Sequence, residues 1–74
     1  MTLQELVDWI VSHAIDQSAT TNEKRFTVVV DLSQVSAEGH MYLAFAIEGS
    51  VQLQEAGLQL ASIESNGCNF TRLQ

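Results

Sequence analysis

The sequence predicts a small α+β domain with the order helix, strand, helix, strand, strand. Three observations support this prediction: an amphipathic first segment, an alternating apolar segment over residues 25–33, and an Asn-Gly pair between two further apolar segments. Strands and helices in this order are typical of a sheet with helices on one side. We expect a single domain over residues 1–74, with a three-stranded, mainly antiparallel sheet and the helices packed on one face.

The first helix has a clear beginning. Thr2 and Glu5 have the spacing of a capping box, in which each side chain satisfies a backbone N–H at the start of a helix. At about 100° per residue, seven apolar residues share one broad face: Leu3, Leu6, Val7, Ile10, Val11, Ala14 and Ile15. Residues 17–22 are polar and have no periodicity, so we expect the helix to end at Asp16 and a loop to follow.

Residues 25–33 give the strongest strand signal in the chain. Phe26, Val28, Val30 and Leu32 alternate onto one face of the strand, and Val29 lies on the other face. The run of three valines predicts a central strand with partial cover on both faces. Because the helices cover the first face, we expect Val29 to lie on a less protected one.

Two interpretations fit residues 36–57. As a helix, the segment begins with Ser36 as N-cap and ends before Gly57, a residue type that favours the position after a helix. As a strand, residues 40–48 alternate, and a short helix follows. Gly39 and Gly49 disfavour a helix, each by up to about 1 kcal/mol in a helix interior. Length and alanine content favour the helix, and the strand stays as the alternative.

The last part of the chain predicts a β-hairpin. Residues 58–64 and 68–73 flank Asn66-Gly67, a pair that favours a two-residue turn with positive φ at both positions. Ile63 is out of phase with the leucines that precede it. We therefore expect a β-bulge near Ala61 or Ser62.

Composition excludes several classes of partner. Nine Asp and Glu stand against three Lys and Arg, giving a formal net charge of −6, so the basic surface that phosphate binding needs is missing. We expect no nucleic-acid partner and no membrane partner, because no apolar run approaches the roughly 20 residues that cross a bilayer. Cys68 is the only cysteine, and the first residues do not resemble a signal peptide. Both observations predict a cytoplasmic protein.

No set of residues in the chain matches a known catalytic or metal-binding pattern. His13 and His40 are far apart in sequence and share no carboxylate at a ligand spacing. Cys68 follows a turn with no helix N-terminus beside it to lower its pKa. No phosphate-binding loop or nucleophile elbow is present. We expect a protein that is not an enzyme, with no catalytic residue, no metal and no cofactor.

Trp9 suggests a protein-binding surface. It falls outside the apolar arc of the first helix, and His13 follows one turn later, beside an acidic strip formed by Glu5, Asp8 and Asp16. Tryptophan is enriched at the centres of protein interfaces, and an acidic rim steers a basic partner. We expect these five residues to bind a protein partner.

The small size of the domain favours association. A chain of this length buries only about 60% of its unfolded surface, and a three-stranded sheet leaves two open edges. We expect a homodimer that acts as a regulatory or inhibitory binding protein, of the kind that phages and plasmids encode. The alternative is a small-ligand-binding protein whose pocket for an anionic metabolite forms at the dimer interface. Its lining residues would be Arg25, Asp31, Tyr42 and Phe45.

Overall fold

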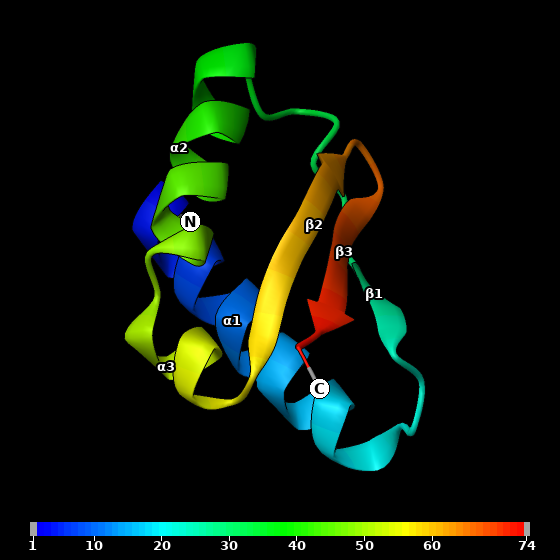
Figure 1. Cartoon of the computed structure of the whole chain (residues 1–74). Helices are drawn as coiled ribbons and strands as arrows, with labels where there is room; N and C mark the ends of the chain where they lie inside the picture. The colour runs from blue at the N-terminus through cyan, green and yellow to red at the C-terminus, as the bar shows by residue number, and fades with distance from the viewer. Residues whose placement is uncertain (1, 74) are drawn as a thin grey trace.

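The computed structural model describes residues 2–73, and its helices cover one face of a three-stranded sheet (Figure 1). The elements are α1 (Leu3–Thr20), β1 (Arg25–Val29), α2 (Ala37–Glu48), α3 (Val51–Glu55), β2 (Leu58–Glu64) and β3 (Gly67–Arg72). The predicted α+β class is confirmed. Two helices, α2 and α3, stand where the sequence predicted one.

Helix α1 begins as predicted and ends later than predicted. The N–H of Glu5 donates to Thr2 Oγ1 at 3.1 Å, and the N–H of Thr2 donates to Glu5 Oε1 at 2.8 Å. The prediction of a loop directly after Asp16 is wrong, because the helix continues to Thr20. Arg72 explains the difference: its guanidinium donates to the carbonyl oxygens of Ser18 and Thr21, and a cation stabilises the end of a helix.

The sheet has the strand order β1-β3-β2, and both strand pairs are antiparallel. The prediction that residues 25–33 form the central strand is wrong, because β1 is an edge strand and β3 is central. β2 pairs with one edge of β3, and β1 pairs with the opposite edge. In this second pair Phe26 lies opposite Phe70, and Val28 lies opposite Cys68. Val29 is 77% exposed on the outer face of the sheet, as predicted.

The helix interpretation of residues 36–57 is confirmed, and the strand alternative is wrong. The Ser36 hydroxyl accepts from the N–H of Gly39 at the start of α2. The helix ends at Gly49, and Ser50 caps the short α3 that follows. This break places the unfavourable Gly49 outside the helix interior. Gly57, with a φ of 75°, follows α3 as predicted and turns the chain into β2.

The hairpin forms one residue earlier than predicted. Glu64 pairs with Gly67, so Ser65 and Asn66 make the turn. No residue other than glycine within 2–73 has a positive φ, so the predicted conformation of Asn66 is wrong. The predicted bulge is confirmed, because the register with β3 shifts between Leu60 and Ser62.

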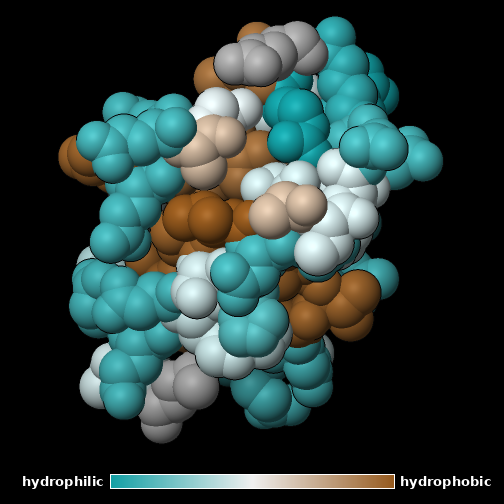
Figure 2. All heavy atoms as spheres, turned by 90° about the horizontal axis from the view of Figure 1, so that it is seen from below, coloured by the Kyte–Doolittle hydropathy of each residue, from teal (hydrophilic) through white to brown (hydrophobic). Residues whose placement is uncertain are grey.

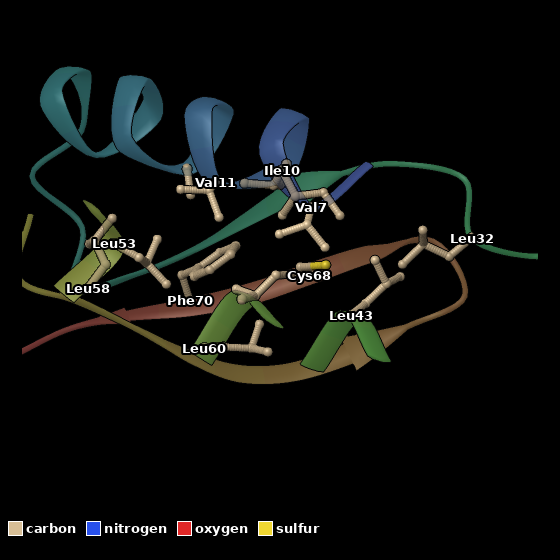
Figure 3. Packing of buried hydrophobic residues seen from close by; sticks show 13 residues of the cluster. Val7, Ile10, Val11, Leu32, Leu43, Leu53, Leu58, Leu60, Cys68 and Phe70 are labelled. Carbon is tan, nitrogen blue, oxygen red and sulfur yellow. The ribbon is translucent and has the colours of Figure 1, made fainter. Parts of the chain in front are cut away.

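The core lies between the helices and the inner face of the sheet. Figure 3 shows Val7, Ile10 and Val11 of α1 pointing toward Phe70 and Cys68 of β3. The ring of Phe70 also stacks on Phe26, with centroids 5.7 Å apart. The buried cluster comprises thirteen residues: Val7, Ile10, Val11, Ala14, Val28, Leu32, Leu43, Ile47, Leu53, Leu58, Leu60, Cys68 and Phe70. The packing fixes which side of each helix faces solvent.

Candidate interaction surface on the helices

Two large apolar side chains lie on the solvent side of α2. Met41 is 61% exposed and Phe45 is 71% exposed. They are one turn apart, so they are neighbours on the helix surface. Leu43 and Ile47 are fully buried on the opposite side of α2. We call Met41 and Phe45 the apolar stripe, and exposed apolar groups of this kind mark binding surfaces when they are contiguous.

The helices around the apolar stripe carry only negative side-chain charges. Three carboxylates lie on α1, two on α2 and one on α3, and these helices contain no lysine or arginine. The basic residues of the chain lie in or beside the strands: Lys24 and Arg25 at the start of β1, and Arg72 at the end of β3, from which its guanidinium reaches the end of α1. We call α1, α2 and α3 together the helix layer. Its field favours a positively charged partner.

Hydrogen bonds connect Tyr42 of α2 to part of the acidic strip that the sequence predicted. The Tyr42 hydroxyl donates to Gln4 Oε1 at 2.8 Å, and Gln4 Nε2 donates to Asp8 Oδ1 at 3.1 Å. Tyr42 follows Met41 in α2, whereas Gln4 and Asp8 belong to α1. Asp8 is therefore a predicted partner-binding residue that hydrogen bonds connect to α2.

Trp9 and His13 form a stacked pair on α1. Their ring centroids are 3.8 Å apart, with an angle of 24° between the planes, and His13 Nδ1 lies 2.8 Å from the Trp9 carbonyl oxygen. His13 is exposed, but Trp9 is half-buried and packs against the hydrophobic core. The expectation of a tryptophan wholly outside the core is therefore corrected. The apolar arc of α1 is wider than the seven residues of the predicted face, and it includes part of Trp9.

The pair lies on a different flank of α1 from Asp8. Trp9, His13 and Gln17 follow one another at intervals of four residues and so form one row along the helix. Gln17 Nε2 donates to the carbonyl oxygen of Thr27 at 3.0 Å, which places this row beside β1. Tyr42 of α2 contacts the other flank, through Gln4. The structure therefore places Asp8 on one flank of α1 and Trp9 and His13 on the other.

Glu5 and Asp16 are both exposed on α1. The pKa of Glu5 is lowered, first by the hydrogen bond from the Thr2 backbone and then by the Thr2 side chain. Its carboxylate therefore holds the start of the helix in addition to contributing charge. Asp16 precedes Gln17, and at about 100° per residue its side chain points away from the row that Gln17 belongs to.

One chain does not bring the four residues of the alternative ligand site together. Arg25 lines a hollow of about 440 Å³ on the outer face of the sheet, whereas Tyr42 and Phe45 are exposed on α2 in the other layer. Asp31 follows β1, and its carboxylate accepts hydrogen bonds from the N–H and the hydroxyl of Ser33. These two bonds lower the pKa of Asp31, the hydroxyl bond more strongly. A pocket with all four residues requires a second chain.

The outer face of the sheet is polar. Asn69 of β3 accepts from the Thr27 hydroxyl at 2.6 Å and donates to Ser62 Oγ at 2.8 Å and to Glu64 Oε2 at 2.6 Å. This network explains why the face lies open to water without a helix to cover it. It also joins side chains of all three strands, because Thr27 belongs to β1 and Ser62 and Glu64 belong to β2.

A second hollow, of about 400 Å³, opens where α3 meets the start of β2. Figure 2 shows this end of the molecule, with apolar atoms reaching the surface amid hydrophilic ones. The lining residues are Glu48, Leu53, Gln54, Leu58, Gln59, Leu60 and Leu73. The only charged side chain among them is acidic, so this hollow does not suit an anionic metabolite.

Cysteine, histidine and the carboxylates are the side chains that nucleophilic catalysis or metal binding would use. Cys68 is buried, and the loss of solvent raises the pKa of its thiol to about 11. Its protonated form is therefore inert at neutral pH. Within residues 2–73, no three His, Cys, Asp or Glu side chains converge as metal ligands.

The sequence contained a signal for the apolar stripe. Met41 and Phe45 belong to both interpretations of residues 36–57: they alternate as in a strand, and they stand one turn apart as in a helix. On a helix whose buried side carries Leu43 and Ile47, they fall on the opposite side. A helical projection of α2 alone would have identified them as exposed.

Comparison with known proteins yields no relative: no family model matches the chain, and no curated protein or solved structure matches it significantly. Among residues 2–73, no helix has the length and apolar character needed to cross a membrane.

Proposed function

We propose that the protein is a cytoplasmic interaction module, homodimeric in its working form, that binds a basic protein through its helix layer. It regulates or inhibits that partner by occupying part of the partner's surface. The exposure of Met41 and Phe45 on α2, within a helix layer whose charged side chains are acidic, carries this proposal. The predicted partner-binding residue Asp8 is connected to this surface through Gln4 and Tyr42.

The apolar stripe and the carboxylates of the helix layer contribute to partner binding in different ways. Full burial of a large apolar side chain contributes about 1.5–3 kcal/mol, so contact with Met41 and Phe45 supplies most of the affinity. The carboxylates around them, Glu38 and Glu48 on α2 and Asp8 on α1, accelerate the encounter with a basic surface and disfavour acidic ones. Added salt screens these charges and therefore slows association.

Capture followed by direct binding tests the proposal. Immobilised wild type and Phe45→Asp are exposed to an extract of the producing cells, with Leu73→Asp as a control because Leu73 is also exposed but lies at the end of the sheet. We expect a basic protein on wild type and Leu73→Asp that is missing on Phe45→Asp. With the purified partner, Phe45→Asp raises Kd at least tenfold. Equal retention of all proteins by wild type and Phe45→Asp contradicts the proposal.

A further inference from the structure

The outer edge of β1 presents backbone groups that pair with no other strand of the described sheet. On its inner side, the Lys24 carbonyl accepts from the N–H of Arg72 at 2.8 Å, and the N–H of Val30 donates to the Asn66 carbonyl at 3.2 Å. Residues in an antiparallel strand alternate in the direction of their N–H and C=O groups. Arg25, Thr27 and Val29 therefore direct theirs away from β3. Figure 1 shows β1 as the outermost strand on this side of the sheet.

The two edges of the sheet differ in how they are protected. The β2 edge is interrupted by the bulge between Leu60 and Ser62, and bulges discourage the pairing of a further strand. β1 has a regular register with β3 over its whole length, and its exposed Val29 adds an apolar side chain to the edge. β1 is therefore the edge better suited to accept a strand.

The charges along this edge complement a second copy of themselves. After β1, the N–H of Leu32 donates to the Ser65 carbonyl oxygen. The alternation of backbone directions therefore continues, and the N–H and C=O groups of Asp31 point outward like those of Val29. Arg25 lies three residues before Val28, and Asp31 lies three residues after it. A second β1, antiparallel and centred on Val28, places Arg25 opposite Asp31 twice and Thr27 opposite Val29 twice. Opposite charges at facing positions stabilise such a pair.

The backbone and side chains around the edge accommodate this arrangement. Both hydrogen bonds that Asp31 accepts from Ser33 use Oδ1, which leaves Oδ2 for Arg25 of a second copy. The carbonyl oxygen of Thr27 accepts from Gln17, and its second lone pair is able to accept from a facing strand.

The α1 row lies on the same side of the molecule as this edge. It consists of Trp9, His13 and Gln17, and the contact between Gln17 and Thr27 fixes its place beside β1. Two chains that pair antiparallel through one sheet hold their helix layers on the same face. The two α1 rows therefore approach each other, and the Trp9–His13 stack supplies aromatic surface to their contact.

We propose that two copies of the chain dimerise through the outer edge of β1, centred on Val28, with reciprocal Arg25–Asp31 ion pairs and with the α1 rows in contact. The inference rests on the homodimer of the proposed function and specifies its interface. The result is a continuous six-stranded sheet. The apolar stripe on α2 lies outside the interface and stays accessible to a partner.

Charge exchange tests this interface. The molar mass of wild type, Arg25→Asp, Asp31→Arg and the double variant Arg25→Asp/Asp31→Arg is measured by size exclusion with light scattering over a concentration series. We expect a wild-type dimer whose Kd rises at least tenfold in each single variant, because like charges then face each other. The double variant restores the ion pairs in reversed order, so its Kd returns to within about threefold of wild type.

Three controls separate a loss of this interface from a change in net charge, an effect of the partner surface or a loss of folding. Lys24→Asp changes the net charge as Arg25→Asp does, but at a position outside the reciprocal pairs, and is expected to stay dimeric. Phe45→Asp is also expected to stay dimeric, which separates this interface from the partner surface. Circular dichroism melts show that each variant is folded.

A wild type that stays monomeric at all concentrations overturns the inference, and partner binding through α2 is still tested by the capture experiment. A dimer that neither single variant weakens, or a double variant that does not recover, also overturns it. A dimer that behaves as described while Phe45→Asp leaves all protein binding unchanged supports the interface and refutes the proposed partner surface.

Discussion

Arg72 of β3 donates a hydrogen bond of 2.8 Å to the carbonyl oxygen of Ser18 near the end of α1. A second bond of 2.9 Å reaches the carbonyl oxygen of Thr21, so a single guanidinium satisfies two acceptors at the end of the helix. No basic residue of α1 itself lies in its last turn. The last strand of the chain therefore completes the first helix.

Replacement of Arg72 by methionine is expected to destabilise the domain and fray the end of α1. Hydrogen bonds from a charged donor contribute about 1.5–3 kcal/mol, and we expect a loss of stability in that range. Urea unfolding gives the change in free energy, and hydrogen exchange at residues 20–22 reports the fraying. Lys24→Met is the control, because Lys24 is exposed. An equal effect in both variants contradicts the importance of the Arg72 contacts.

Much of the fold follows from local signals in the sequence. The capping box of Thr2 and Glu5, the caps at Ser36 and Gly57, and the bulge at Ala61 depend on neighbouring residues, and each is present. The end of α1 depends on Arg72, more than fifty residues away in the chain, and no local pattern reveals it. Strand order is similarly non-local, because an alternating segment fits an edge as well as the centre of a sheet.

The candidate surfaces were harder to predict than the elements. The sequence placed Trp9 and His13 on a flank beside the acidic strip, but it did not show which element of the fold packs against each flank of α1. Tyr42 contacts Gln4 on one flank, and Thr27 contacts Gln17 on the other. The uncertainty between helix and strand also hid the apolar stripe, whose exposure depends on the buried positions of α2.

Two glycine-to-alanine substitutions are expected to differ in cost for separate physical reasons. A Cβ at Gly67 would lie 2.5 Å from the Val28 carbonyl oxygen, so β1 and β3 must move apart. Gly57 has nothing within 4 Å of such a Cβ, and its φ of 75° is the only obstacle. We expect Gly57→Ala to cost about 1–2 kcal/mol and Gly67→Ala to cost more. Thermal or urea unfolding measures both, and a smaller effect at Gly67 is inconsistent with the close approach.

The Cys68 thiol is expected to make stability fall at high pH. Its pKa is about 11 in the folded protein against an ordinary value of 9.0, because burial disfavours the thiolate. The unfolded chain therefore loses the proton first. The stabilisation is complete below pH 9 and is lost between pH 9 and pH 11, at about 1.4 kcal/mol per pH unit.

Unfolding of wild type and Cys68→Ala across this pH range checks the prediction. The difference between the two proteins isolates the contribution of the thiol from that of every other group. We expect wild type to lose stability relative to Cys68→Ala as the pH rises. In addition, a thiol reagent at pH 8 is expected to react with Cys68 only on unfolding. Parallel pH profiles, or rapid labelling of the native protein, contradict a buried protonated thiol.

Leu43 and Phe45 are two residues apart in α2, and substitution of the two is expected to change the stability of the domain by very different amounts. Leu43 is fully buried, and truncation of such a side chain to alanine costs about 2–5 kcal/mol. Phe45 is 71% exposed, so Phe45→Gln is expected to change the free energy of unfolding by no more than about 0.5 kcal/mol. Chemical denaturation of Leu43→Ala and Phe45→Gln measures both. The comparison is made at concentrations where the chain is monomeric. A loss of unfolding free energy above about 1 kcal/mol for Phe45→Gln would show that this side chain packs within the domain. It would then not be available to a partner.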